Sequence, residues 1–311
     1  MQSWMSALIS VLMLSTVSAL PLTVPHLNYC YTEDSCSPYN WVKMFPTCIA
    51  KESGLHSPIN LQRGVIKNNS IDPLELQSFD VPQKSWTVVN VRDTVVVKFQ
   101  AGMTVKGGGI KHNYRIVEMR FHWGSNTTNG SEHKFDARRF PMEMQIVGVA
   151  PGFADVEAAS VVQSGLLMMG VFIDIASEEN QAFKAIAHAV LNVPYPGDSV
   201  SVSPPALSHL LPEDDTFYQY HGGQTTPPCR QTVTWIVFEK PIFISRKQEQ
   251  VKYAVLDVCS NICPNAKYSQ CFAPHRFVRY IILVDCPTVG SERNIYTCFY
   301  VLLNSLHSLF A

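Results

Sequence analysis

The sequence lacks a marked excess of charge of either sign, because 24 Lys and Arg residues balance 25 Asp and Glu residues and leave a formal net charge of -1. It therefore offers neither the basic surface that nucleic acid requires nor an acidic tail, and we expect no nucleic-acid partner. Internal repeats and low-complexity linkers are also missing. The length of 311 residues then fits one large globular domain or two small ones, and composition alone selects no function.

Long apolar runs are scarce as well. The run at the N-terminus covers residues 5–17 and is too short to cross a bilayer comfortably. It ends in Val17-Ser18-Ala19, the small-residue pattern of a cleavage site. We therefore predict a secretory signal peptide over residues 1–19. The alternative is a buried N-terminal helix, which Pro21 and Pro25 disfavour because they follow at once.

Two further features are typical of a secreted chain. Nine cysteines suit an oxidising compartment, and an odd count leaves at least one thiol unpaired or paired with another molecule. Three N-x-S/T sequons predict glycosylation on exposed loops, at Asn68, Asn126 and Asn129.

The central part of the chain reads as one mixed domain dominated by β-sheet. Five segments rich in Val, Ile, Phe, Met or Trp predict strands, at residues 86–99, 115–123, 142–149, 166–175 and 232–238. One helix is expected where Phe183, Ile186, Ala187, Val190 and Leu191 fall at helical spacing. Ser177 is its expected N-cap, and Pro194 and Pro196 end it.

Two of these strands carry polar residues on one face. Side chains alternate along a strand, so Glu118, Arg120 and His122 should oppose an apolar face made of Val117, Met119, Phe121 and Trp123. In the strand at 142–149, Glu143 and Gln145 likewise oppose a run of apolar residues. One interpretation is an antiparallel sheet with one face in water. The other is that both polar faces line a single cleft.

Several motifs in the same order resemble those of the α-carbonic anhydrase family. They are Ser57-Pro58-Ile59-Asn60, Gly107-Gly108-Gly109, Met119-Arg120-Phe121-His122-Trp123-Gly124, Gly130-Ser131-Glu132-His133, Met142-Glu143-Met144-Gln145-Ile146-Val147, Thr225-Thr226-Pro227-Pro228 and Val233-Thr234-Trp235-Ile236-Val237-Phe238. The resemblance covers roughly residues 28–250 and is specific because many spaced motifs agree. It implies a mixed, mainly β fold with a central twisted, mostly antiparallel sheet and peripheral helices.

The resemblance places a catalytic zinc site on three positions of this chain, of which only His122 keeps a histidine. The other two are Arg120 and Gln145. Arginine stays protonated and offers no lone pair, so it cannot bind zinc. A glutamine carbonyl oxygen is a poor zinc ligand beside imidazole. We therefore predict no bound metal and no cofactor, and without zinc the attacking water keeps its ordinary high pKa.

Other positions of the resembling site are partly altered. Asp93 stands where active members carry a proton-shuttle histidine, and a carboxylate is a poor shuttle near neutral pH. Thr225, Thr226 and Glu132 resemble the groups that orient the zinc-bound water, and Glu143 resembles the group that holds the third ligand. The pocket walls include Val147 and Trp235, but also Gln224 and Met168 where small or branched apolar residues are usual.

A buried arginine needs an anionic partner. We expect the Arg120 guanidinium to pair with Glu118 on its own strand face, or to reach Glu143 or Glu132 across the cleft.

The cysteines of the main body resemble those of the extracellular, membrane-anchored isozymes. That resemblance implies disulfides Cys30–Cys36 and Cys48–Cys229.

After residue 250 the resemblance ends. We therefore divide the chain into the signal peptide, a carbonic anhydrase-like domain over residues 20–250, and a divergent tail over residues 251–311 that replaces the C-terminal part of the fold. The tail holds Cys259, Cys263, Cys271, Cys286 and Cys298. Its last apolar run is a weak match for a lipid-anchor signal.

Three functions remain open from the sequence. The first is a secreted or cell-surface module that binds an extracellular protein partner or acts in adhesion and has no catalytic activity. Catalytically silent members of the family that the chain resembles, such as the ectodomains of certain receptor tyrosine phosphatases, have this role. The second is an active zinc-dependent carbonic anhydrase that hydrates carbon dioxide to bicarbonate. The third is a truncated product that folds poorly.

Overall fold

A computed structural model describes Tyr29, Tyr31 and residues 37–48, 57–64, 68, 70–91, 93–125 and 127–252. The predicted signal peptide, the Cys30–Cys36 pair, Asn126 and the tail from residue 253 lie outside these residues. No helix in the described part of the chain is long and apolar enough to span a membrane.

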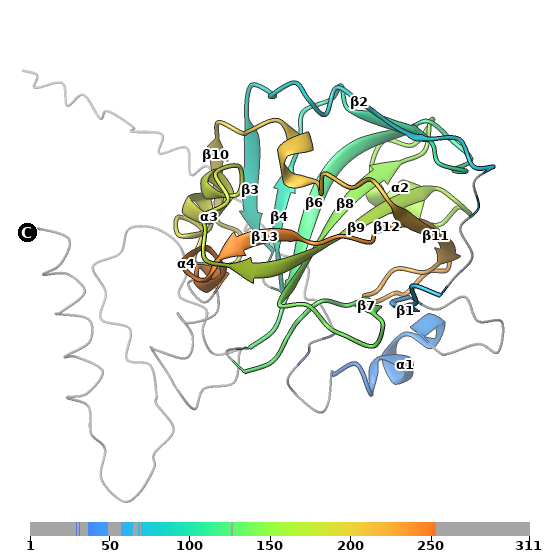
Figure 1. Ribbon diagram of the computed structural model, residues 1–311. Helices are drawn as coiled ribbons and strands as arrows, with labels where there is room; N and C mark the ends of the chain where they lie inside the picture. Colours follow the sequence, from blue (N-terminus) through green and yellow to red (C-terminus); the bar gives the residue numbers. More distant parts are fainter. Residues whose placement is uncertain are drawn as a thin grey trace, which may run out of the picture.

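The described residues form a mainly β fold with short helices (Figure 1). The helices are α1 (Trp41–Met44), α2 (Val156–Ser160), α3 (Lys184–Val190) and α4 (Arg246–Gln250), with 3-10 turns η1 (Pro46–Cys48) and η2 (Leu207–Leu210). The strands are β1 (Asn60–Leu61), β2 (Leu74–Gln77), β3 (Trp86–Asn90), β4 (Val95–Lys98), β5 (Thr104–Gly107), β6 (Tyr114–Trp123), β7 (Lys134–Phe135), β8 (Met142–Val149), β9 (Leu166–Ala176), β10 (Ser199–Val202), β11 (Phe217–Gly222), β12 (Val233–Phe238) and β13 (Ile242–Ser245).

One large twisted sheet organises the molecule. Its strands run in the order β10-β3-β4-β6-β8-β9-β12-β11, with β13 beside β9 and the β2–β5 pair attached through β6. Most neighbours are antiparallel, whereas β12 and β13 each pair with β9 in parallel. The expected class, a mostly antiparallel central sheet with peripheral helices, is therefore confirmed.

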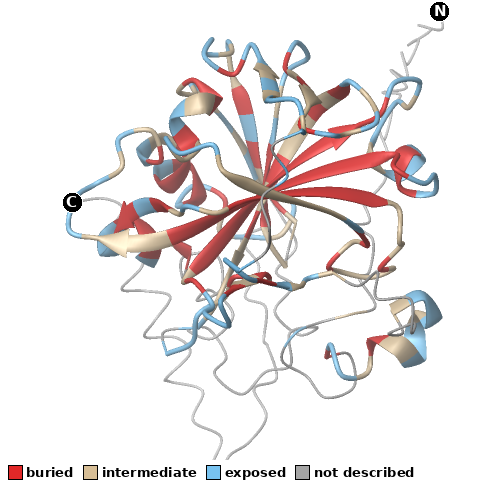
Figure 2. Ribbon diagram, turned by 45° about the vertical axis from the view of Figure 1, so that its right-hand side comes forward, coloured by how far each residue is buried: buried red, intermediate tan, exposed pale blue. Residues whose placement is uncertain are grey.

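The sheet is buried on both faces, as the red central strands of Figure 2 show. One face packs into a core with α3, built around Met119, Met144 and Ile186. The opposite face packs into a second core that includes Val147, Met168 and Trp235, and this is the face on which the polar residues of β6 and β8 lie. The interpretation of a sheet with one face in water is therefore wrong.

Four of the five predicted strands agree with β6, β8, β9 and β12 to within one residue. The segment 86–99 is not one strand, because the chain reverses after Asn90 to form the β3–β4 hairpin. The amide of Val91 donates to the carbonyl of Thr94 (3.0 Å) and closes that turn. The reversal places Asp93 and Thr94 at the rim of a pocket instead of inside a strand.

The predicted faces of the strand at 115–123 also need one correction. The β6–β8 pairing shifts register between Ile116 and Glu118. Such a bulge inserts one residue and changes the face of its neighbours. Ile116 therefore joins the core that contains Met119, whereas Val117 packs on the opposite core.

The predicted helix exists but is shorter than expected. It begins at Lys184, so Ser177 is not its N-cap, and it ends at Val190, before Pro194. The N-cap position is Phe183, which makes no side-chain capping hydrogen bond. The Asn180 side-chain oxygen holds the turn before the helix, because it accepts from the amide of Phe183 (3.0 Å). The backbone of Asn180 is fixed in turn by two hydrogen bonds with Gln248 of α4.

Candidate functional site

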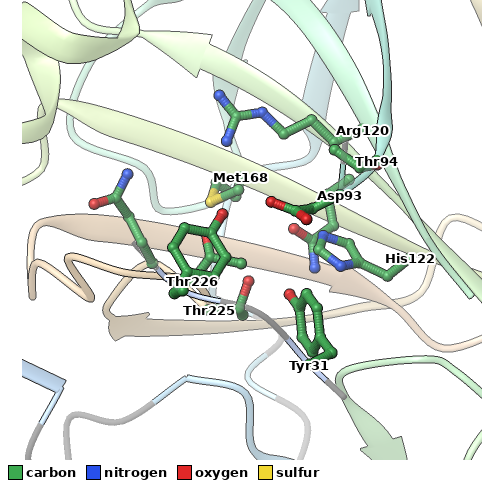
Figure 3. Close-up of a pocket in the computed structure, with 11 residues that line it drawn as sticks. Tyr31, Asp93, Thr94, Arg120, His122, Met168, Thr225 and Thr226 are labelled. Carbon is green, nitrogen blue, oxygen red and sulfur yellow. The ribbon is translucent and has the colours of Figure 1, made fainter. Parts of the chain in front are cut away.

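The polar residues singled out from the sequence meet in one pocket (Figure 3). Strand β6 supplies Arg120 and His122, β8 supplies Gln145 and β9 supplies Met168. The β3–β4 turn and the loop after β11 complete the walls, with two tyrosines from the N-terminal segment. The lining residues from these parts are Tyr29, Tyr31, Asp93, Thr94, Gln224, Thr225 and Thr226. Of the two interpretations left open, a shared cleft agrees with Arg120, His122 and Gln145, whereas Glu118 and Glu143 do not line this pocket.

Strand pairing explains why these side chains meet. Arg120 lies directly opposite Gln145 in the antiparallel β6–β8 pair, and His122 lies opposite Glu143. Directly opposed side chains on one face of such a pair lie within contact distance. The register therefore brings together three positions that are separated by up to 25 residues in the sequence.

Arg120 is bound to Glu118, the first of the three partners that the sequence left open. Its Nε and Nη2 atoms lie 2.7 and 2.6 Å from the same carboxylate oxygen, Glu118 Oε1. The two side chains are 28% and 13% exposed, so the pair is largely sheltered from solvent. The charge of Arg120 is therefore balanced by a neighbour on its own strand.

The Gln145 amide is held in one orientation. Its Nε2 donates to Glu132 Oε2 (2.8 Å) and to Glu143 Oε1 (2.9 Å), which uses both amide hydrogens. Gln145 is fully buried, and its Oε1 has no hydrogen-bond partner among the described residues. Glu132 Oε2 also lies 3.4 Å from His122 Nε2.

Thr225 and Glu132, which resemble the groups that orient the zinc-bound water, are not joined by a hydrogen bond in the described structure. The Glu132 carboxylate accepts from Gln145 and lies near His122, and Thr225 lines the pocket.

Beneath the pocket lies a hydrogen-bond network that the sequence did not predict as a unit, and its central residues, His133 and Glu143, are fully buried. His133 bonds Glu143 twice, through its backbone amide to Oε2 and through Nδ1 to Oε1, both at 2.8 Å. Its Nε2 lies 2.7 Å from the Tyr220 hydroxyl, which lies 2.9 Å from Ser57 Oγ. His133 belongs to one of the sequence motifs, whereas Tyr220 sits on β11, far away in the sequence, and belongs to none of them.

Glu143 is ionised in this network. Burial on its own would raise the pKa of the carboxyl, but the charge of His133 and the hydrogen bonds from His133 and Gln145 outweigh it and lower the pKa to about 2. Glu143 thus receives three hydrogen bonds while excluded from water.

Two tyrosines were missed by the sequence analysis. Tyr29 and Tyr31 line the pocket and pack edge-on against Trp41. Burial, followed by the charge of Asp93, raises the pKa of Tyr29, and burial with the charge of Glu132 raises the pKa of Tyr31. Both phenols therefore stay protonated at neutral pH. No local pattern around them signals this long-range packing.

The covalent and surface features agree in part with expectation. The Cys48–Cys229 disulfide is present, with Cα atoms 4.9 Å apart, and it ties α1 and η1 to the loop that carries Thr225. Asn68 and Asn129 are exposed. No group of three or more His, Cys, Asp or Glu side chains among the described residues is arranged to hold a metal ion.

The family model for eukaryotic-type carbonic anhydrases matches residues 36–261. The chain belongs to the carbonic anhydrase family. It is 33% identical over 239 residues to human receptor-type tyrosine-protein phosphatase zeta, covering 75% of this chain but 10% of that protein. It is 31% identical over 241 residues to mouse carbonic anhydrase 15, covering 73% of this chain and 74% of that protein. Human carbonic anhydrase 6 is 28% identical over 277 residues, with coverages of 86% and 88%.

The chain therefore spans about a tenth of the length of the phosphatase relatives, and about three quarters or more of these two carbonic anhydrases. The zinc that this family implies does not fit the residues present. A catalytic zinc in such a site needs three protein ligands, typically imidazoles. Here His122 is joined by an arginine that is engaged with Glu118 and by a glutamine amide. We therefore derive no step through a metal.

Proposed function

We propose that this carbonic anhydrase homologue is extracellular, holds no catalytic zinc, and acts as a binding or adhesion module for a protein partner. The observation that carries the proposal is the Arg120–Glu118 ion pair, which stands directly opposite Gln145 where the metal ligands would be. A permanent cation at this point repels a divalent ion and contributes no lone pair.

The rest of the pocket supports loss of catalysis. Without zinc, no group in the pocket lowers the pKa of water enough to give hydroxide at neutral pH. Asp93 lines the rim at the position that resembles the proton-shuttle site, where active members carry a histidine, the side chain suited to exchange protons near pH 7. Met168 and Gln224 change the shape and polarity of the walls.

The presence of the Glu132 and Glu143 carboxylates has a structural explanation. Glu132 and Glu143 fix the Gln145 amide, and Glu143 also fixes His133. Buried carboxylates that lose their donors destabilise a fold strongly. The carboxylates therefore have a role in stability whether or not the site turns over.

The proposed location follows from the apolar N-terminus, the cysteine content and the sequons. The Cys48–Cys229 disulfide is consistent with an oxidising compartment, and exposed Asn68 and Asn129 are accessible to glycosylation. A lipid anchor attached through the tail would place the protein on the outer face of the plasma membrane.

The competing function is a zinc-dependent carbonic anhydrase, which the family membership favours. Zinc content and carbon dioxide hydration, measured on the same secreted and dialysed sample, separate the two. We expect zinc far below one ion per chain and hydration at the uncatalysed rate. Stoichiometric, tightly held zinc with rapid bicarbonate formation would overturn the proposal.

A further inference from the structure

An apolar groove lies on the face of the sheet opposite the candidate site, at the edge of the core that contains Met119. Strands β4, β6 and β8 and the region of α3 contribute only apolar side chains to it. They are Val95, Phe121, Trp123, Met142, Phe183, Ile186 and Val190. The remaining wall is α4, which lies beside α3 (Figure 1). An apolar surface of this kind marks a place where another segment or molecule docks.

The described part of the chain ends at this groove. Lys252 is its last residue, lines the groove and is only 3% exposed. It forms an ion pair with Glu249, which is 4% exposed and also pairs with Arg246. Because consecutive Cα atoms lie about 3.8 Å apart, the residue that follows a buried lysine starts inside the protein. The chain therefore continues from the groove and not from a point in solvent.

The wall that α4 contributes follows one side of a helix. Its four lining residues are Gln248, Glu249, Val251 and Lys252. Their spacing is that of neighbours on a single helix face. The backbone keeps right-handed helical angles at Val251, with φ -62° and ψ -20°. One turn further on the same face, four residues after Val251 and Lys252, the sequence has Val255 and Leu256.

The residues that follow Lys252 suit an apolar surface. Residues 253–256 are Tyr, Ala, Val and Leu and carry no charge, and Asp257 is the first charged residue after them. The match to the carbonic anhydrase family model also continues to residue 261. These four residues therefore lie within the part of the chain that matches the family, ahead of the divergent remainder of the tail.

We infer that residues 253–256 continue α4 by one turn and fill the apolar groove with the side chains of Val255 and Leu256. The occupant is this chain itself, because the chain already reaches the groove at Lys252. An occupant from a second molecule would have to displace a segment that is covalently held beside its binding surface. The effective concentration of such a tethered segment is high, which favours docking within one chain.

The docked segment has a consequence for the candidate site. Phe121 lies between Arg120 and His122 on β6 and lines the groove, whereas its two neighbours line the pocket on the other face. Residues 253–256 therefore support from behind the strand that carries two of the altered metal positions. The inference does not rest on the proposed function, since the groove is apolar whether or not the pocket binds zinc.

Photocrosslinking in the full-length secreted chain tests where the segment lies. Leu256→p-benzoylphenylalanine introduces a ketone that inserts into C–H bonds within contact distance when it is irradiated, and crosslinked peptides are identified by mass spectrometry. We expect crosslinks within one chain to the peptides that contain Met142 or α3. The control is Ile282→p-benzoylphenylalanine, in a later apolar run of the tail, which should give no crosslink to the groove.

Hydrogen exchange of full-length variants tests whether the contact stabilises the fold. Leu256→Asp places a charge in the apolar groove and should speed amide exchange in α3 about tenfold or more, because the helix loses a packing partner. Leu256→Met conserves the apolar volume and should keep the slow exchange of the wild type. Ile282→Asp is the matched control and should leave exchange in α3 unchanged.

Three results overturn the inference. The first is crosslinks from position 256 that join only two separate chains, which would assign the groove to a second copy. The others are no crosslink from position 256 to the groove, and equal exchange of α3 in Leu256→Asp and the wild type. If Leu256→Asp does not fold, the crosslinks decide alone. The zinc content of the same sample reports only on the proposed function, so the two can fail separately.

Discussion

The two levels of the candidate site differ in how completely their polar groups are satisfied. In the lower level, His133 bonds both Glu143 and Tyr220 through contacts of 2.7–2.8 Å, and Glu143 and His133 are fully buried. In the upper level, Arg120 turns to its own strand neighbour and Gln145 keeps an unpartnered oxygen. The comparison teaches that the hydrogen bonds of the buried lower level do not depend on those of the upper level, so the two can be tested separately.

The largest expected change is in zinc binding, when the two missing histidines are restored to the upper level. Arg120→His combined with Gln145→His supplies three imidazoles on the β6–β8 pair, above an unchanged Glu143. We expect zinc to rise from near zero to about one ion per chain, measured by elemental analysis after dialysis. Carbon dioxide hydration should then be slow but rise with added imidazole buffer, because Asp93 does not shuttle protons.

Arg120→His alone is the control for this repair and should bind zinc far more weakly, since only two imidazoles are present. If the folded double variant takes up no zinc, the lower level does not provide the support that we ascribe to it.

The next largest expected change is in the free energy of unfolding, when the Glu143 carboxylate at the centre of the lower level is removed. Glu143→Ala deprives the His133 amide, its Nδ1 and the Gln145 amide of their acceptor at once. We expect a loss of about 3–5 kcal/mol in the free energy of unfolding, measured with urea. Glu75→Ala breaks an exposed ion pair with Lys106 and should cost less than about 1 kcal/mol. Similar losses in the two variants would contradict the distinction between the levels.

Acid should weaken the lower level in a defined range. The pKa of Glu143 falls from its ordinary value of 4.5 to about 2 on folding, so its contribution is complete above pH 4.5 and is lost as the pH falls toward 2. The shift corresponds to about 3 kcal/mol. Urea unfolding between pH 7 and pH 2 should show this loss, and Glu143→Gln should have a smaller pH dependence over that range. An unchanged pH dependence in the variant would assign the effect to other groups.

The smallest effect concerns the Arg120–Glu118 pair. Arg120→Met leaves the Glu118 carboxylate, which is 13% exposed, without its cation. Because solvent reaches part of the pair, we expect a loss of about 1–2 kcal/mol by urea unfolding. Lys106→Met is the matched control on an exposed pair and should change stability by less than about 1 kcal/mol. Equal stability of Arg120→Met and the wild type would refute a structural role for the pair.

The local sequence pattern predicted most strands of the sheet, but not the β3–β4 turn or the bulge in β6. The strand at 142–149 follows from the alternation of Met142, Met144 and Ile146 with polar residues, and β8 has those bounds. The reversal at Val91–Thr94 lacks Gly and Pro, the usual signals of a turn, so the β3–β4 hairpin was read as one strand. The bulge next to Val117 depends on pairing with β8 and leaves no trace in the alternation of β6 itself.

The candidate site was predictable where family motifs fix the position, and not where distant segments meet. Arg120, His122 and Gln145 were placed together from their motifs, and they line one pocket. The partner of Arg120 remained open among three carboxylates because side-chain direction depends on the packed structure. Tyr29, Tyr31 and Tyr220 reach the site through tertiary packing, which no short pattern in the sequence encodes.

Strand β9 has a consequence for the order in which the chain assembles. It pairs with β8, which precedes it closely, but also with β12 and β13, which the ribosome makes much later. Until Ser245 has emerged, the apolar edge of β9 is left without its parallel neighbours, and such non-local pairing is slow. Newly made chains should therefore depend on chaperones during this interval, when the exposed edge is open to aggregation.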